Sequence, residues 1–173
     1  MTKKSLLFGG LIGGAMSLVF LIMFYGVGKR MDYGTSEIFG FTTMILATAA
    51  VFFGIRNYRN RDLGGQIGFG RALGTGTLIS LVAALAFGIF TACLYAFTDY
   101  STQLVASYTD HIQNSGRSEA EVAQALAELE AQSAMFNNPW VGALTMIFTV
   151  FPIGFVMSLI SAAILRTPGS KQG

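Results

Sequence analysis

The chain has 173 residues, of which 53% are hydrophobic and only 12% carry a charge. Soluble domains carry about 25% charged residues, and disordered chains are poor in apolar and aromatic residues, so this composition excludes both classes. The net charge of +2 is too small for a nucleic-acid binder, and the single cysteine, Cys93, excludes a disulfide scaffold or a cysteine-based metal cluster. The composition indicates a membrane protein.

Four apolar runs predict four transmembrane helices. They cover residues 6–27, 38–55, 72–97 and 140–165. A helix needs about 20 apolar residues to cross about 30 Å of hydrocarbon, and the second run is the shortest that meets this requirement. Because none of the runs alternates as a membrane-spanning strand would, we expect an all-α membrane protein that forms a single membrane domain over residues 1–173.

The distribution of Lys and Arg predicts the orientation of these helices. Eight basic residues would lie on one side of the membrane: Lys3, Lys4, Arg56, Arg59, Arg61, Arg71, Arg166 and Lys171. Three would lie on the other side: Lys29, Arg30 and Arg117. Loops in the cytoplasm carry the excess of Lys and Arg. We therefore expect a multi-pass protein of the bacterial cytoplasmic (inner) membrane with both termini in the cytoplasm.

The segment 98–138 is too long for a plain connection between two spans and predicts a two-helix hairpin, which the orientation places outside the cytoplasm. Gly116 suits the end of the first helix, where a positive φ is often needed. Ser118 and Glu121 have the spacing of a capping box and predict the start of the second helix. Asn138-Pro139 then predicts the start of the fourth span, because Pro is favoured at the first helical position.

The second helix of this hairpin presents Val122, Leu126 and Leu129 on one face. Two interpretations remain open. The hairpin either packs its apolar faces together or lies on the lipid surface, or else it presents these residues as a docking surface for an envelope partner. Helices that adsorb to lipid usually carry Lys and Arg on the polar face, whereas this one carries Glu, which favours mutual packing over adsorption.

The third predicted span has a small residue at every fourth position, a pattern that lets helix backbones approach closely in lipid. These candidate packing residues include Ala72, Gly76, Ser80, Ala84, Gly88 and Ala92. Four residues turn about 400° around the helix axis, so the stripe of small residues shifts by about 40° around the helix at each step. A single neighbouring helix therefore cannot contact the whole stripe. We expect this helix to be central. The first span has its own set of small residues, which either pack within the chain or, alternatively, mediate homodimerisation: Gly9, Gly10, Gly13, Gly14 and Ser17.

The segment 56–71 reads as a basic cytoplasmic linker between the second and third spans. Its arginines, Arg56, Arg59, Arg61 and Arg71, are candidate contacts for anionic lipid head groups, which attract a basic residue near the surface by about 1 kcal/mol. The alternative is that these residues only set the topology and extend to the interface along their apolar stems.

Residues that carry catalytic chemistry are missing where a membrane enzyme or pump would need them. No Asp, Glu, Lys, Arg or His lies within the four apolar runs, although such residues mark proton relays and ion paths. His111 is the one histidine, and Cys93 lies in the apolar third span. We therefore expect no enzyme activity, no catalytic residue, no metal site and no cofactor.

Two sequence blocks are similar to those of a known family. FFGIRNYR at residues 52–59 and LGGQIGFGRAL at residues 63–73 resemble a bacterial family catalogued as domain of unknown function 4199. Shorter similarities lie at residues 118–121, 138–139 and 151–154, so the resemblance covers nearly the whole chain. It implies a multi-pass protein of the bacterial inner membrane and lends no activity.

These observations favour a non-enzymatic protein that acts by binding membrane or envelope partners. The lipid bilayer, anionic lipids, a membrane-protein partner and a homo-oligomer are the partners considered, and nucleic acid is not. The alternative is a small channel, carrier or lipid-handling protein. Its path would run between the third helix and the fourth, which Pro152 and Gly154 should kink.

Overall fold

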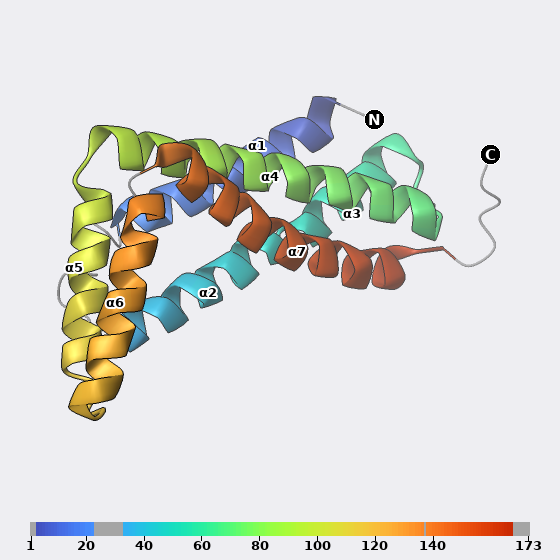
Figure 1. Cartoon of the computed structure of the whole chain (residues 1–173). Coiled ribbons are helices and arrows are strands. Elements are labelled where there is room, and N and C mark those ends of the chain that lie inside the picture. The colour runs from blue at the N-terminus through green and yellow to red at the C-terminus, as the bar shows by residue number, and fades with distance from the viewer. Residues whose placement is uncertain (1–2, 23–32, 137, 168–173) are drawn as a thin grey trace.

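The computed structural model describes residues 3–22, 33–136 and 138–167, and these residues are almost entirely helical, with no strand among them. The helices of this described part are, in chain order, α1 (Lys3–Ile22), α2 (Tyr33–Ala49), α3 (Val51–Asp62), α4 (Phe69–Phe97), α5 (Tyr100–Gln113), α6 (Glu119–Phe136) and α7 (Pro139–Leu165). Four segments are long and apolar enough to cross a membrane, namely α1, residues 38–62 of α2 and α3, α4 and α7. The all-α class is therefore confirmed (Figure 1).

The second span consists of two helices that meet at Ala50. The Ala50 amide donates to the Ala47 carbonyl at 3.1 Å, and the Phe53 amide donates to the Ala50 carbonyl at 3.0 Å. Hydrogen bonds between residues three apart tighten a helical turn. Ala50 itself keeps a right-handed helical conformation (φ −61°, ψ −16°). The helix therefore continues through Ala50 and ends at Asp62, beyond the predicted end at Ile55.

Two glycines end α3 and turn the chain toward α4. Gly64 and Gly65 have φ values of +61° and +89°, which only glycine adopts readily. The Gly65 amide donates to the Arg59 carbonyl at 2.9 Å, and this bond satisfies a carbonyl at the helix end. Much of the predicted linker 56–71 is therefore helical.

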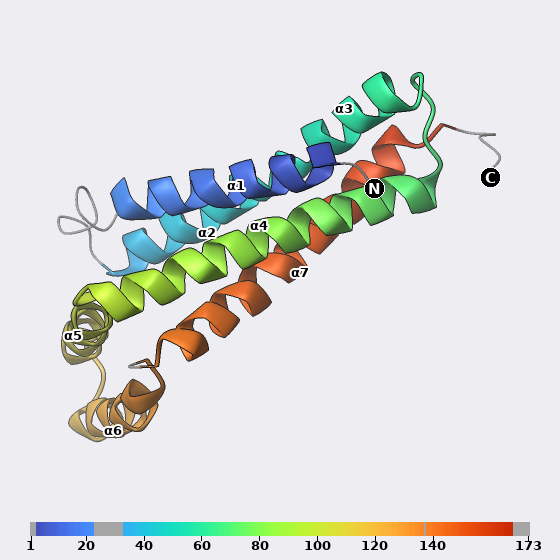
Figure 2. The ribbon, with the colours of Figure 1, turned by 90° about the horizontal axis from the view of Figure 1, so that it is seen from above.

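Helix α4 is central, as the drifting stripe of small residues predicted. Its most extensive contact is with α7, followed by α1, and it also contacts α3. Figure 2 shows α4 running between α1 and α7. The fully buried side chains Ile55, Ile79, Phe87 and Val150 come from α3, α4 and α7 and form the core between these helices.

Helices α5 and α6 form the predicted hairpin. They pack against each other, and Figures 1 and 2 together show them running across the direction of α4 rather than along it. They lie at the end of the bundle where α4 ends and α7 begins. The start of α1 and the end of α7 lie at the other end (Figure 1).

Candidate functional site

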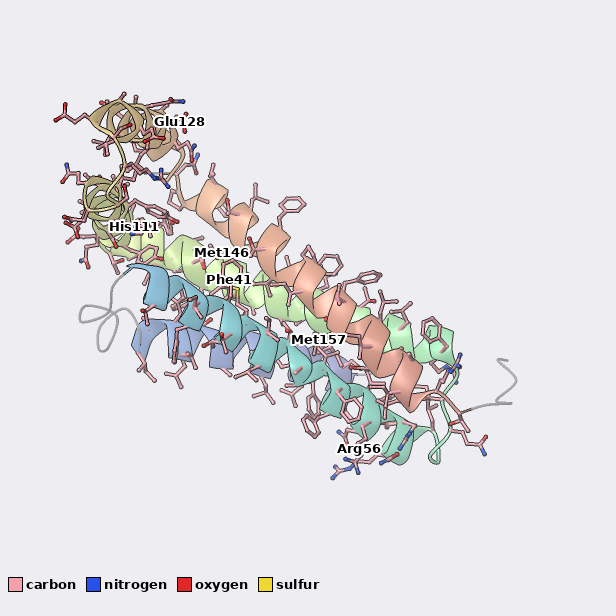
Figure 3. All side chains as sticks on the ribbon, turned by 90° about the horizontal axis from the view of Figure 1, so that it is seen from below. Phe41, Arg56, His111, Glu128, Met146 and Met157 are labelled. Atoms are coloured by element: carbon pink, nitrogen blue, oxygen red, sulfur yellow. The ribbon has the colours of Figure 1, made fainter. Side chains whose placement is uncertain are left out.

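Basic side chains gather at the end of the bundle away from the hairpin. The described ones are Lys3 and Lys4 of α1, Arg56, Arg59 and Arg61 of α3, Arg71 of α4 and Arg166 after α7. The structure therefore places all four candidate lipid-binding arginines at one end. Figure 3 shows Arg56 at this end and His111 and Glu128 of the hairpin at the other. Lys29, Arg30, Lys171 and the predicted end of the first span at residue 27 lie outside the described residues.

Arg59 differs from the other three arginines because its guanidinium binds protein groups. Its Nη1 donates to the carbonyl of Leu165 at 3.3 Å, and its Nε donates to Oδ1 of Asn60 at 2.9 Å. Leu165 is the last residue of α7, where helix carbonyls lack internal partners and the helix dipole favours a cation. Arg59 therefore caps α7, and its half-buried side chain joins α3 to that helix.

Two further contacts hold the basic end together. Lys4 Nζ and Asp62 Oδ1 lie 2.8 Å apart and join α1 to α3. The Thr167 amide donates to the Ile67 carbonyl at 2.9 Å, and the Ile67 amide donates to Thr167 Oγ1 at 3.3 Å. The loop before α4 is thus fixed to the chain that follows α7.

The remaining cations at this end are exposed to the surroundings. They are Lys3, Arg56, Arg61, Arg71 and Arg166. In the part of the chain that the structure describes, the Lys4–Asp62 contact is the one ion pair. Since Asp62 is the described acid of this end and is already engaged, the exposed surface there is strongly positive.

The described large apolar side chains of the hairpin are half-buried. Val122, Leu126 and Leu129, predicted as a possible partner surface, are all half-buried on the face of α6 that recurs with helical spacing. Large exposed apolar side chains occur on α1, α2, α3, α4 and α7, but none is found among the described side chains of α5 and α6. Half-burial of all three residues is compatible with either interpretation of the hairpin. The four glutamates of α6 are exposed on the two sides of this stripe, with Glu119 and Glu130 on one side and Glu121 and Glu128 on the other.

The capping box at the start of α6 forms as predicted. The Ser118 hydroxyl and amide donate to Glu121 Oε2 at 2.7 Å and 3.0 Å, and the Glu121 amide approaches Ser118 Oγ at 3.4 Å. The hydrogen bonds from the Ser118 side chain and backbone, helped by nearby Arg117, lower the pKa of the Glu121 carboxyl. Gly116 has a φ of +69° at the predicted break between the two helices.

An aromatic contact that the sequence pattern does not reveal joins the hairpin to the spans. The Tyr100 ring, at the start of α5, lies 5.5 Å from the Phe20 ring of α1 and 5.2 Å from the Tyr95 ring of α4, measured between centroids. Burial, followed by the neighbouring Tyr95 and Tyr108, raises the pKa of Tyr100. Each aromatic residue is visible in the sequence, but their meeting depends on how three helices pack.

Close packing of α4 and α7 uses the predicted small residues. A Cβ on Gly154 would lie 2.7 Å from the Ser80 Cβ, and one on Gly76 would lie 2.8 Å from the Ser158 Cβ. A Cβ on Gly88 would lie 2.7 Å from Ile147 Cγ1. The stripe residues Ala72, Gly76, Ser80, Ala84 and Gly88 are buried, and Ala92 is half-buried. The predicted route for a solute between these helices therefore coincides with a close contact.

The glycines of α1 divide into two faces, and Gly10 and Gly14 lie on the outer one. A Cβ on Gly13 would lie 2.7 Å from the Ala86 Cβ and 2.8 Å from the Ala83 carbonyl oxygen, and Gly9 is similarly close to α4. Around Gly10 and Gly14 nothing lies within 4 Å of an added Cβ. Gly9 and Gly13 thus make the close contact with α4, whereas the homodimerisation alternative stays open for Gly10 and Gly14 on the outer face.

The fold and the charge distribution define a helical membrane protein with four candidate spanning helices. Within residues 3–22, 33–136 and 138–167, no group of three His, Cys, Asp or Glu residues is placed to hold a metal ion. A family described as "Protein of unknown function (DUF4199)" matches residues 7–167. The chain therefore belongs to the DUF4199 family, as its resemblance predicted. Comparisons with curated proteins and with solved structures found no match.

Proposed function

We propose that this chain is a non-enzymatic protein of the bacterial cytoplasmic (inner) membrane that acts by binding membrane or envelope partners. The basic end and both termini would face the cytoplasm, and the α5–α6 hairpin would face outward. The observation that carries this proposal is the segregation of charge. The exposed cations gather at the ends of α3 and α7, whereas the exposed carboxylates of α6 lie at the opposite end. Such an arrangement matches the positive-inside rule.

The exposed glutamates of α6 are the groups proposed to contact a protein partner. Glu128 and Glu130 are exposed, and Gln124 donates to Glu128 at 3.0 Å along the same helix. The described large apolar side chains of α6 are half-buried, so contact with a partner would be mainly polar. A partner with basic side chains complements this surface, and charge complementarity gives specificity and speeds association.

The orientation is tested by single-cysteine labelling of the full chain in intact cells. Cys93→Ala removes the native thiol, and Gln113→Cys and Gln66→Cys then place one exposed cysteine on the hairpin or at the basic end. We expect a membrane-impermeant maleimide to label Gln113→Cys in intact cells and Gln66→Cys only after the cells are permeabilised. The opposite pattern would overturn the proposed orientation.

The binding role is tested by native mass spectrometry of the protein released gently from its own membranes. We expect a second protein at fixed stoichiometry, lost in the Glu128→Lys/Glu130→Lys variant and kept in Asp110→Lys, which places a reversed charge on the exposed surface of α5. No stoichiometric partner in the unaltered protein, or a partner retained equally by both variants, would contradict the proposed role of α6.

A further inference from the structure

The outward face of α3 combines an exposed aromatic side chain with exposed arginines. We propose that this face binds an anionic phospholipid, with Arg56 and Arg61 contacting the phosphate and Phe53 contacting the acyl chain. The inference rests on the proposed role of the basic end at a membrane surface and names its ligand. Arg59 is assigned to a structural contact instead. The proposal therefore distinguishes Arg59 from Arg56 and Arg61, although the three arginines look alike in the sequence.

Helical geometry places both arginines on the side of α3 that faces away from the protein. A helix turns about 100° per residue. Viewed along the axis of α3, Arg56 therefore lies about 60° to one side of Phe53, and Arg61 lies about 80° to the other side. Ile55 is buried and Tyr58 is half-buried on the opposite side. All three proposed contact residues are exposed, so they are available to a ligand outside the bundle.

The order of side chains along α3 matches the two parts of a phospholipid. Phe53 is 59% exposed and lies about one turn before Arg56, and Arg61 lies farther along the same helix, beyond the apolar region. An arginine stem can extend along apolar surface and place its guanidinium at the head-group level. This order from apolar to cationic favours a membrane lipid over a free phosphate or a soluble polyanion.

The charges around these arginines also suit a phosphate. Neither Arg56 nor Arg61 has an ion-pair partner among the described residues, because Asp62 is bound to Lys4 at 2.8 Å. Guanidinium groups bind phosphate oxygens through paired hydrogen bonds, a geometry that a lysine ammonium does not reproduce. The site therefore offers unpaired donors of the kind that an anionic head group requires.

Arg59 provides a matched control on the same helix. It lies between Arg56 and Arg61 in sequence, yet its guanidinium donates to the Leu165 carbonyl and to Asn60. Replacing it removes one positive charge from the same end of the bundle, as a single substitution at Arg56 or at Arg61 would. Its loss should weaken the contact between α3 and α7 without removing the proposed phosphate donors.

The experiment is native mass spectrometry of the full chain in detergent, titrated with phosphatidylglycerol or with phosphatidylcholine of identical acyl chains, and then with inorganic phosphate as a competitor. We expect the unaltered protein to retain phosphatidylglycerol preferentially, and Arg56→Gln/Arg61→Gln to retain at least fivefold less while keeping its melting temperature. Arg59→Gln should keep most of the bound lipid but melt at a lower temperature. Arg56→Lys/Arg61→Lys, which keeps the charge, should recover only part of the binding.

Three results would overturn the proposal. These are equal retention of both lipids by the unaltered protein, unchanged retention in Arg56→Gln/Arg61→Gln, and full displacement of phosphatidylglycerol by inorganic phosphate. The last result would assign the site to a free anion. The titration in detergent does not depend on the orientation or on a partner at α6, so its outcome is separate from the cysteine-labelling and partner experiments above.

Discussion

The hydroxyl oxygens of Ser80 and Ser158 lie 3.1 Å apart between α4 and α7. The Ser158 hydroxyl donates to the Gly154 carbonyl at 2.7 Å, and a hydroxyl has one hydrogen to donate. Ser80 is therefore the donor to Ser158. Gly154 accepts the hydrogen bond from Ser158 and also has no side chain, which lets α7 approach Ser80 closely.

Adding a methyl group to Gly154 should destabilise the bundle. In Gly154→Ala the new Cβ would lie 2.7 Å from the Ser80 Cβ, and overpacking of this kind costs about 1–3 kcal/mol. Gly74→Ala is the matched control on α4, because nothing lies within 4 Å of a Cβ at that position. Thermal unfolding in detergent, followed by circular dichroism, should show a lower melting temperature for Gly154→Ala alone. Equal melting temperatures would refute the close contact.

The serine pair should contribute modestly to stability. Hydrogen bonds between membrane helices average about 0.6 kcal/mol in double-mutant cycles, and Ser80 and Ser158 are both almost fully buried. We expect a coupling free energy of that size from Ser80→Ala, Ser158→Ala and the double variant, measured by unfolding in mixed detergent. A coupling of zero within error would mean that the hydroxyl contact does not stabilise the fold.

Neighbouring glycines on α1 should respond differently to the same substitution. Gly13→Val should lower the melting temperature, because its added atoms would meet Ala83 and Ala86 of α4, whereas Gly14→Val should leave it nearly unchanged. Cross-linking in membranes then tests whether the outer glycines join two copies of the chain. If homodimerisation uses this face, Gly14→Val reduces the dimer and keeps the monomer fold. If Gly13→Val and Gly14→Val melt alike, the assignment of faces is wrong.

The capping box should make the start of α6 sensitive to acid. The pKa of Glu121 is lowered in the folded hairpin by its hydrogen bonds with Ser118, so its carboxylate stabilises the hairpin above the usual pKa of a glutamate. That contribution is lost as the pH falls through the lowered value. Hydrogen exchange of the amides at the start of α6, corrected for intrinsic rates, should show weaker protection at acid pH.

Two variants separate this capping effect from general acid destabilisation. Glu121→Gln removes the carboxylate and should abolish most of the pH response of these amides. Glu119→Gln leaves the contact between Ser118 and Glu121 in place and should keep the response. A pH response that persists in Glu121→Gln would assign it to another group.

Local signals predicted the helix ends well. Gly116, Ser118 and Asn138-Pro139 act within one helical turn, and the structure shows the positive φ at Gly116, the capping box at Ser118 and the Asn138 side chain accepting from Trp140 at 3.0 Å. The continuation of α3 past Ile55 was missed because polarity suggested a linker, whereas the helix ends only where Gly64 and Gly65 reverse the chain.

The features that were missed depend on contacts between helices. Gly9 with Gly13 and Gly10 with Gly14 have the same spacing, so the sequence of one helix does not reveal which pair faces α4. The four arginines were similarly equivalent until the end of α7 was placed beside Arg59. No Gly or Pro lies within three residues of the tight turn at Ala50, so no residue type in the sequence marks this turn. Its position depends on how the helices pack.

The turn at Ala50 has a consequence for how the chain is inserted. Helix α2 has 17 residues and α3 has 12, which rise about 26 Å and about 18 Å, and both lengths fall short of about 30 Å of hydrocarbon. The two halves together form one candidate span over residues 38–62, so the proposed topology requires them to enter the membrane as one hydrophobic unit. If α3 were left outside that unit and α2 failed to cross, the number of crossings would become odd, and every segment from α4 onward would lie on the side opposite to the one proposed.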